Sequence, residues 1–461
     1  MHRLGKTLAV AAATATALGV LGLSASAQAQ PASPAVRAGD PQVPAGVETA
    51  VGLTACPTGN TVSSVTSAPN LPATVNSITK GNTAKLSGDW PASPSSYAVT
   101  LHCSGGSTVK SAITVLATPA ETAIVGVGSD TYQSVADQFS ADYNATLNGT
   151  STRPLYNWDA TNPTTGAALD PIVTKSGCSS IQRPDGGSAG LSAMDANAKT
   201  SDGKQFCIDF TRIARARSSS DPPFAPGGVA FVTLAEDAIT YSTQTTTDAP
   251  SNLTTAQLAG IYNCTDTNWS QVGGKSGTIK PVLPLTGSSL AKQFLLDIGV
   301  ATPGACVTQT AQQNDGVQSV VKGPGVIFPY SVAKWIAQKF HSAPCLNSTC
   351  TASSGVICKP ATGQNQFGCD QHGTLKLNSI NGIAPTTGTG KATVINPSFY
   401  GTSYGNPISD VVRYDSTTTD HIPAYLEPIY GAHGWACTSK TAKADLKNYG
   451  FVLLPTCGLA S

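Results

Sequence analysis

Residues 123–143 are AIVGVGSDTYQSVADQFSADY, and three local patterns follow one another along this segment. Its first part, residues 123–127, is apolar and predicts a buried strand. A glycine turn covers residues 126–130, and from Thr131 onward apolar side chains recur at the spacing of one helix face. A strand that runs through a glycine turn into an amphipathic helix predicts an α/β architecture.

The same alternation continues to about residue 340. A capping-box pattern at Thr254 predicts the start of a helix that buries Leu258 and Ile261. Apolar runs at residues 229–234 and 326–330 predict strands that cross between two lobes. We therefore expect a two-lobed α/β domain over residues 119–461. Lobe 1 is predicted to comprise about 119–234 plus 329–461, and lobe 2 about 235–328.

Residues 43–118 have a different texture, with short strands at 96–101 and 111–116 and turns rich in Gly, Pro, Asn and Ser. Cys56 and Cys103 lie about fifty residues apart with Trp90 between them. This pattern predicts a small Ig-like β-sandwich that serves as an accessory domain.

The first residues predict export. His2, Arg3 and Lys6 precede an apolar run at 8–23, and alanines follow at 25, 27 and 29. This is the pattern of a signal peptide over residues 1–29, followed by a linker over 30–42. The run is too short to span a membrane. Because the first cysteine is Cys56, no lipid anchor is expected. We predict a secreted, extracellular protein, with cell-wall association left open.

The chain has 12 cysteines, an even number that predicts disulfides in an oxidising compartment. Eight of them are predicted to form four long-range pairs, and the other four could pair locally. Because these four contain no CxxC pair, a zinc site is the weaker interpretation. The predicted pairs are Cys56 with Cys103, Cys178 with Cys207, Cys264 with Cys306 and Cys437 with Cys457, and the local set is Cys345, Cys350, Cys358 and Cys369.

The formal charge of +1 and the 11% of charged residues exclude a broad basic face for nucleic acid. The six histidines are scattered without HExxH or another ligand spacing, so no metal and no cofactor are predicted. We expect a monomer in which any recognition of an anion is local.

Three loops share small and hydroxyl residues where a helix begins: residues 128–131, 183–190 and 286–289. The first N–H groups of a helix lack internal partners and lie at the positive end of its dipole, so neutral donors there can hold a phosphate or a sulfate. Each loop alone is explained by ordinary helix capping. Three on one chain favour a ligand site.

Residues 121 to about 340 resemble the phosphate-binding proteins of ABC transporters, a periplasmic-binding-protein-like (type II) family. Residues 125–131 stand in the place of the family's first glycine loop, and residues 187–190 followed by 208–210 are similar to its second loop and Asp-Phe strand. Residues 252–269 are similar to its leucine-threonine, leucine-alanine, asparagine-tryptophan segment. The resemblance implies a phosphate site between two lobes, an ABC permease as partner and no catalysis.

Two departures concern the ligand. The family's third loop is Arg-Ser-Asp-Gly-Ser-Gly-Thr, whereas residues 284–290 are PLTGSSL and lack the arginine and the aspartate. The family's Ser-Asp after the Asp-Phe strand is replaced by Ile213-Ala214. In the family the arginine balances ligand charge, and the aspartate accepts the proton that hydrogen phosphate has and sulfate lacks.

Other residues can replace these functions. Arg183 is the first choice for the charge and Arg212 the next, with Arg215 a third candidate; Asp130 or Asp185 can accept the proton. The competing interpretations are a surface ion pair for Arg183 and a solvated face for Arg212 and Arg215. The predicted ligand-binding residues are Ser129, Asp130, Thr131, Arg183, Asp185, Ser188, Arg212, Ser288 and Ser289.

Two other functions fit parts of the sequence. Residues 186–190 fit GxSxG, the nucleophile elbow of serine hydrolases, with His421 or His433 downstream. Proline and charge just before this motif argue against the strand that an elbow requires, and residues 401–405 match the same pattern by chance. A cell-wall or adhesion role through residues 43–118 is the other alternative.

Overall fold

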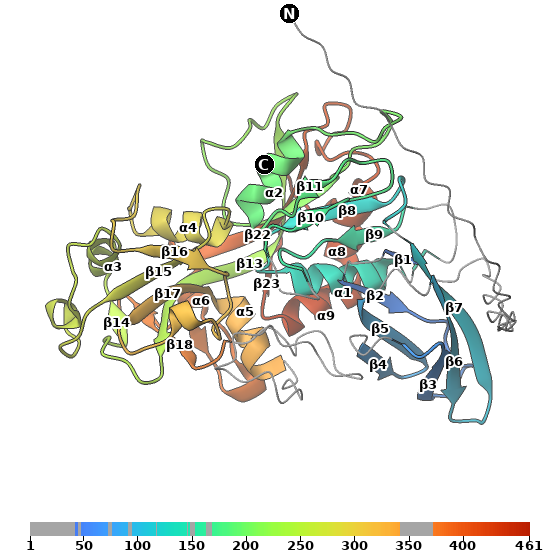
Figure 1. Cartoon of the computed structure of the whole chain (residues 1–461), viewed down its shortest axis with the longest axis horizontal. Coiled ribbons are helices and arrows are strands. Elements are labelled where there is room, and N and C mark those ends of the chain that lie inside the picture. The colour runs from blue at the N-terminus through green and yellow to red at the C-terminus, as the bar shows by residue number, and fades with distance from the viewer. Residues whose placement is uncertain are drawn as a thin grey trace, which may run out of the picture. The chain divides into compact units, whose positions relative to one another are not determined.

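The structure is a computed structural model of the chain (Figure 1). The predicted signal peptide, most of the predicted linker and the local cysteine set at 345–369 lie outside the residues that it describes. Among the residues that it describes, no helix is both long and apolar enough to cross a membrane. The described residues are 42–44, 48–71, 76–90, 95–116, 118–144, 146–147, 153–162, 168–341 and 372–461.

Residues 42–116 form two small sheets. Leu86 and Tyr97, one from each sheet, share an apolar cluster with Trp90. The ring centroids of Trp90 and Tyr97 lie 5.8 Å apart. That these strands make a separate Ig-like accessory domain stays a prediction. One sheet has the order β1 (Gln42–Pro44), β7 (Thr108–Leu116), β6 (Ser96–Cys103), β3 (Val62–Ala68), and the other β2 (Glu48–Gly52), β5 (Thr83–Asp89), β4 (Asn76–Lys80).

The rest of the described chain is built on one mixed sheet with the order β16-β15-β17-β13-β22-β12-β8-β9, to which β18 and β23 add on β13. Its strands are β8 (Ile124–Gly128), β9 (Leu155–Asn157), β12 (Phe210–Ala214), β13 (Val229–Gln244), β15 (Lys280–Pro284), β16 (Thr308–Ala311), β17 (Val326–Ser331), β18 (Leu375–Leu377), β22 (Gly405–Arg413) and β23 (Val452–Leu453).

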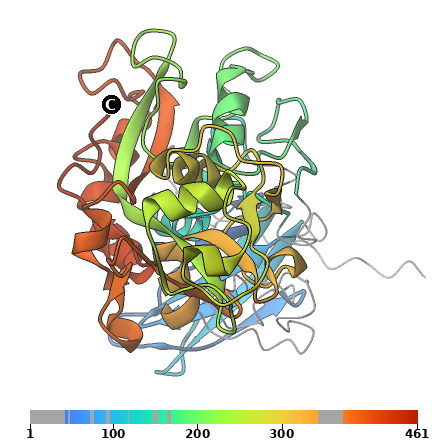
Figure 2. The same ribbon diagram turned by 90° about the vertical axis from the view of Figure 1, so that its left-hand side faces the viewer.

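Strand β13 belongs to both halves of this sheet. Its first part pairs with β22, and residues 239–242 pair with β17. Figure 2 shows β13 and β22 running side by side. The two strands predicted to cross between lobes are therefore present as neighbours, β13 and β17. The residue limits assigned to each lobe stay a prediction.

The predicted helices are present with shifted ends. Thr254 caps α3 through the expected capping box with Gln257, whereas α1 begins at Gln133 instead of Thr131. The helices are α1 (Gln133–Asn144), α2 (Gly187–Asp195), α3 (Thr255–Tyr262), α4 (Ser289–Asp297), α5 (Val332–Ile336), α6 (Pro397–Tyr400), α7 (Glu427–Tyr430), α8 (Trp435–Thr438) and α9 (Lys440–Asn448).

Short elements connect these parts. They are the 3-10 turns η1 (Trp269–Val272), η2 (Ser319–Val321) and η5 (Gly390–Ala392), the π-helical turn η3 (Ala337–His341) and the two-stranded pairs β10 (Pro171–Ile172) with β11 (Ile181–Gln182), β14 (Asn252–Leu253) with β19 (Ser379–Ile380), and β20 (Thr386–Thr387) with β21 (Val394–Ile395).

Strand β8 is buried on both faces, as its apolar run predicts. Ile124 joins the apolar cluster that contains Phe139 of α1, whereas Val125 and Val127 join the cluster that contains Leu191 of α2. Figure 1 shows α1 and α2 on opposite sides of β8. The loop that follows β8 therefore lies where both helices begin.

The four predicted long-range disulfides are confirmed. Cys178–Cys207 and Cys264–Cys306 have Cα separations of 5.8 and 5.9 Å, within the range that a disulfide spans. Cys56–Cys103 and Cys437–Cys457 are also bonded. These bonds agree with the oxidising compartment predicted from the cysteine count.

Candidate functional site

The three hydroxyl-rich loops lie at three helix starts. Ser129 and Thr131 follow β8 and are 0% and 1% exposed. Ser188 is the second residue of α2, and Ser288 caps α4 by accepting a hydrogen bond from the Ala291 N–H. The sequence therefore placed each loop at a helix N-terminus correctly, and the structure adds which loops touch.

The second and third loops are in direct contact. The N–H groups of Ser188 and Ala189 donate to the carbonyl oxygen of Gly287 at 3.1 and 3.4 Å. A Cβ added to Gly186, which has a φ of 101°, would lie 2.4 Å from that same oxygen, so only glycine fits there. Two N–H donors at the start of α2, where free donors for an anion are expected, are thus engaged by a backbone carbonyl.

The first and third loops meet at one buried side chain, Gln313, which is 2% exposed. The Ser288 hydroxyl donates to Gln313 Oε1. Gln313 Nε2 donates to Ser129 Oγ at 3.2 Å and to Thr131 Oγ1 at 3.1 Å, and it also donates to Asp130 Oδ1. Ser129, Thr131 and Ser288 therefore surround a single carboxamide.

Gln313 is the middle of three consecutive carboxamides, Gln312, Gln313 and Asn314, which we call the amide segment. Gln312 Nε2 donates to Asp185 Oδ1 at 3.0 Å, and Asn314 Nδ2 donates to Thr131 Oγ1 at 3.2 Å. The segment directly follows β16. No ligand role was predicted for these residues, and the run of three amide residues after a strand is the signal that the sequence offers for them.

Arg212 lies directly behind the first loop. Its side chain is fully buried, and Nε donates to the carbonyl oxygen of Ser129 at 3.0 Å. The two terminal nitrogens donate to Asn157 Oδ1 and to the Trp158 carbonyl oxygen at 2.8 and 2.7 Å. Within the described part of the chain no carboxylate forms a salt bridge with Arg212. The guanidinium therefore adds positive charge beneath residues 129–131.

The competing interpretation of Arg212 and Arg215 as a solvated face is wrong, because both side chains are buried. Arg215 forms a bidentate ion pair with Asp221, at 2.6 Å for each bond. This pairing explains why Arg215 lies inside the protein and assigns it a structural role.

Arg183 is also buried and ion-paired, but with Asp170. A second hydrogen bond joins Arg183 to Asp170 at 3.2 Å, and a third reaches the Asp159 carbonyl oxygen at 3.1 Å. Although burial acts in the opposite direction, hydrogen bonds from Arg183 and Asn162 lower the pKa of Asp170. Arg212 rather than Arg183 therefore contacts the first loop.

Two polar atoms of the second loop have no hydrogen-bond partner among the described residues: Asp185 Oδ2 and Ser188 Oγ. Asp185 is 5% exposed, and burial raises its pKa to about 6. Buried polar atoms are rarely left unsatisfied, so such atoms call for an explanation. Ser289 differs, because its hydroxyl accepts the Ala214 N–H at 3.2 Å.

The GxSxG match does not form a nucleophile elbow. Strand β11 before it has only two residues and ends before the proline, and Ser188 Oγ has no partner in the described chain. The His421 ring instead stacks on Tyr414, with ring centroids 4.4 Å apart. Among the described residues, no group of three or more His, Cys, Asp or Glu is placed to hold a metal ion.

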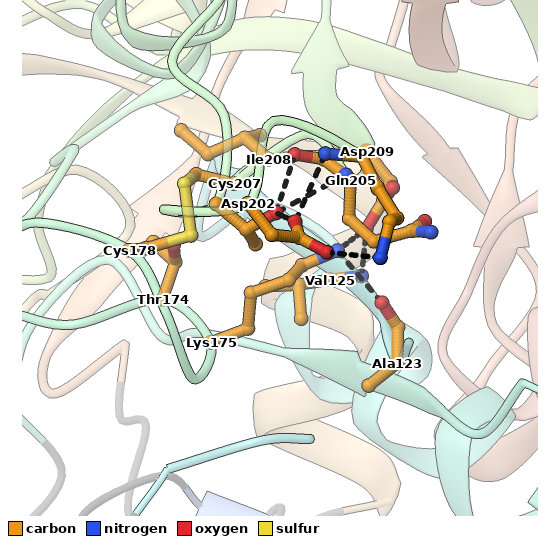
Figure 3. Close-up of a disulfide and its surroundings, with 12 residues drawn as sticks. Ala123, Val125, Thr174, Lys175, Cys178, Asp202, Gln205, Cys207, Ile208 and Asp209 are labelled. Carbon is orange, nitrogen blue, oxygen red and sulfur yellow. Dashed lines mark hydrogen bonds and ion pairs between the residues drawn. A yellow bond between two sulfur atoms is a disulfide. The ribbon is translucent and has the colours of Figure 1, made fainter. Parts of the chain in front are cut away.

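A second buried polar cluster fixes the strands that carry the first loop (Figure 3). Lys175 Nζ lies 2.5 Å from Asp209 Oδ2 and donates to the Ala123 carbonyl oxygen at 2.7 Å. The same Asp209 oxygen accepts the Val125 N–H at 2.8 Å, and Tyr425 donates to the other at 3.0 Å. This cluster, beside the Cys178–Cys207 disulfide, ties the start of β8 to the chain entering β12.

Comparisons with solved structures find weak likenesses. An ABC-type phosphate transport receptor from Vibrio cholerae is 17% identical, with a TM-score of 0.42, covering 72% of this chain and 100% of that one. PstS from Borrelia burgdorferi is 14% identical, with a TM-score of 0.36 and coverages of 72% and 99%. A human phosphate-binding apolipoprotein is 15% identical, with a TM-score of 0.37 and coverages of 72% and 91%.

No curated protein matches the chain. A family model described as the PBP superfamily domain matches residues 91–400, more than half of the chain. The match spans all three loops, the amide segment and the strands of the mixed sheet except β22 and β23. It confirms the two-lobed α/β fold class and the family resemblance drawn from the sequence. The chain therefore belongs to the PBP superfamily.

Proposed function

We propose that this protein is a secreted solute-binding protein that holds a small oxyanion, phosphate first, among the three loops and releases it unchanged. The observation that carries the proposal is the convergence of Ser129, Thr131 and Ser288 on one point, with the Arg212 guanidinium behind them. An ABC permease is the partner that this role implies.

Hydroxyl donors and a buried cation suit an oxyanion. Hydrogen bonds to a charged group are stronger than those between neutral groups, and Arg212 raises the local potential without a carboxylate bonded to it among the described residues. Asp130 and the open Oδ2 of Asp185 are acceptors for the proton of hydrogen phosphate. Sulfate lacks such a proton and would meet these oxygens with lone pairs only.

Titration calorimetry with phosphate and sulfate tests the proposal. Wild-type protein is expected to bind phosphate more tightly than sulfate. Ser288→Ala should weaken phosphate binding at least several-fold, because it removes one donor from a buried anion. The matched control is Ser439→Ala, since Ser439 also caps a helix, α9, but contacts none of the three loops in the described structure.

Both variants lose a helix cap, so both should be destabilised by about 1 kcal/mol. Only Ser288→Ala should change phosphate affinity. Absence of phosphate binding in the wild type, or equal weakening in both variants, would contradict the proposal.

A further inference from the structure

Gln313 occupies the place that the proposed function gives to the ligand. Its oxygen accepts the Ser288 proton, and its nitrogen donates to Ser129, Thr131 and Asp130. A carboxamide presents one acceptor oxygen and two N–H donors. Toward these loops it therefore offers the same combination, an acceptor and donors, that a protonated oxyanion offers.

The backbone of the amide segment is held from its own side. The Asn314 carbonyl oxygen accepts from Tyr330 and Gln338 at 2.5 and 2.8 Å, and Asn314 Oδ1 accepts the Ser331 N–H at 3.0 Å. Gln318 donates to the Gln312 carbonyl oxygen at 2.8 Å. When a ligand displaces Gln313, the glutamine side chain would therefore rotate about its own bonds, while the backbone of the segment stays in place.

The Ser288 hydroxyl shows why the two occupants exclude each other. It has one proton, which it donates to Gln313 Oε1, and its oxygen already accepts the Ala291 N–H. The same proton cannot also be donated to a ligand oxygen. Asp130 Oδ1 is likewise engaged by Gln313 Nε2.

We propose that the Gln313 carboxamide is an internal competitor of the ligand, and that its displacement sets the affinity of the site. This inference rests on the proposed function. When the binding-competent state is only part of the population, the apparent dissociation constant rises by the inverse of that fraction. Removing the carboxamide should therefore tighten binding, which is the opposite of the effect expected for a residue that contacts the ligand.

The test compares inorganic phosphate binding by the wild type and by Gln313→Ala, using calorimetry on the full chain. Loss of the competing hydrogen bonds should tighten binding about tenfold. Gln313→Asn keeps the amide but shortens it by one methylene, so it should give a smaller gain and serves if the alanine variant does not fold. The matched control is Gln244→Ala, a buried glutamine bonded to Val321 and Thr374.

A thermal melt with and without phosphate gives a second readout. Gln313→Ala should melt lower than the wild type without phosphate but gain more from phosphate, whereas Gln244→Ala should melt lower in both conditions by the same amount. A residue with a purely structural role would behave like Gln244.

The outcomes separate the two proposals. If the wild type binds phosphate and Gln313→Ala binds it equally or more weakly, Gln313 does not compete with the ligand. The proposed function is then unaffected. If neither protein binds phosphate, the proposed function fails and the competitor with it.

Discussion

Two buried polar clusters of this protein are built in opposite ways. Around Lys175 and Asp209 the contacts are charged, both carboxylate oxygens have partners, and a disulfide lies beside them. Around Gln313 a neutral amide contacts hydroxyls and one carboxylate oxygen, that of Asp130, and none of these contacts with the amide is an ion pair. Two atoms of the neighbouring loop, Asp185 Oδ2 and Ser188 Oγ, have no partner in the described structure.

The difference separates permanent contacts from exchangeable ones. Breaking a buried ion pair leaves an uncompensated charge, which typically costs 3–5 kcal/mol, so no ligand could displace such a contact readily. A neutral hydrogen bond contributes about 1 kcal/mol and can be replaced by another of the same kind. The first cluster therefore suits a scaffold and the second a binding site.

The largest expected effect is the loss of the charged cluster. Asp209→Ala leaves Lys175 buried without its counter-ion and should lower the free energy of unfolding by about 3–5 kcal/mol, measured by denaturant titration. The control is Asp202→Ala, which breaks the exposed Lys204–Asp202 pair and should leave stability close to unchanged. Similar losses in both variants would remove the contrast between buried and exposed pairs.

Removal of the neighbouring disulfide should have the next largest effect. Cys178→Ala with Cys207→Ala opens a loop of 29 residues and should cost about 3 kcal/mol of unfolding free energy. Combined with Asp209→Ala, the loss should differ from the sum, because contacts that share one segment couple. Simple additivity would show that the disulfide and the ion pair act independently.

Asp185→Asn tests the cluster around Gln313 and the second loop through the pH dependence of stability. Burial raises the pKa of Asp185 to about 6, so the folded protein binds this proton more tightly than the unfolded chain does. Stability from this group is therefore present at low pH and is lost as the pH rises to about 6. The variant should reduce the slope of unfolding free energy against pH. Its free energy of unfolding at neutral pH should rise by on the order of 2 kcal/mol.

Denaturant titrations across this pH range provide the measurement. The slope should not vanish, because burial also raises the pKa values of Asp237 and Asp410, to about 6 and about 7. An unchanged slope in Asp185→Asn would mean that Asp185 is ionised normally in the folded protein.

The smallest effect on stability is expected for Ser188→Ala. Its hydroxyl has no partner among the described residues, so the free energy of unfolding should change by less than about 0.5 kcal/mol. Phosphate affinity should nevertheless fall several-fold if this hydroxyl donates to the ligand. A loss of stability well above that limit would place Ser188 with the scaffold instead.

Local patterns in the sequence predicted the parts whose signals are short-range. The strand and helix at 123–143, the capping box at Thr254 and the pairing of neighbouring cysteines all depend on residues close in the chain. The partners of Gln313 could not be found this way, because Ser129 and Thr131 lie 184 and 182 residues away from it in the chain.

The contact between Arg212 and the first loop could not be predicted for the same reason. From the sequence Arg183 ranks before Arg212, although both lie near a proposed ligand loop. What separates them is the register of β12 against β8, which sets Arg212 beside Gly128 at the start of the first loop. Register depends on how the strands of the sheet align with one another, so it cannot be predicted from the sequence of a single loop.

Strand β13 also constrains the order in which the protein can fold. Its partners include β17, β22 and β23, and the backbone groups of Phe231 and Ser461 are joined by two hydrogen bonds. A ribosome synthesises Phe231 long before Ser461, so β13 must wait for about half of the chain before its pairing is complete. Such distant pairing slows folding and leaves strand edges exposed in the meantime. The pairing of β13 can therefore be completed only after the C-terminal residues have left the ribosome.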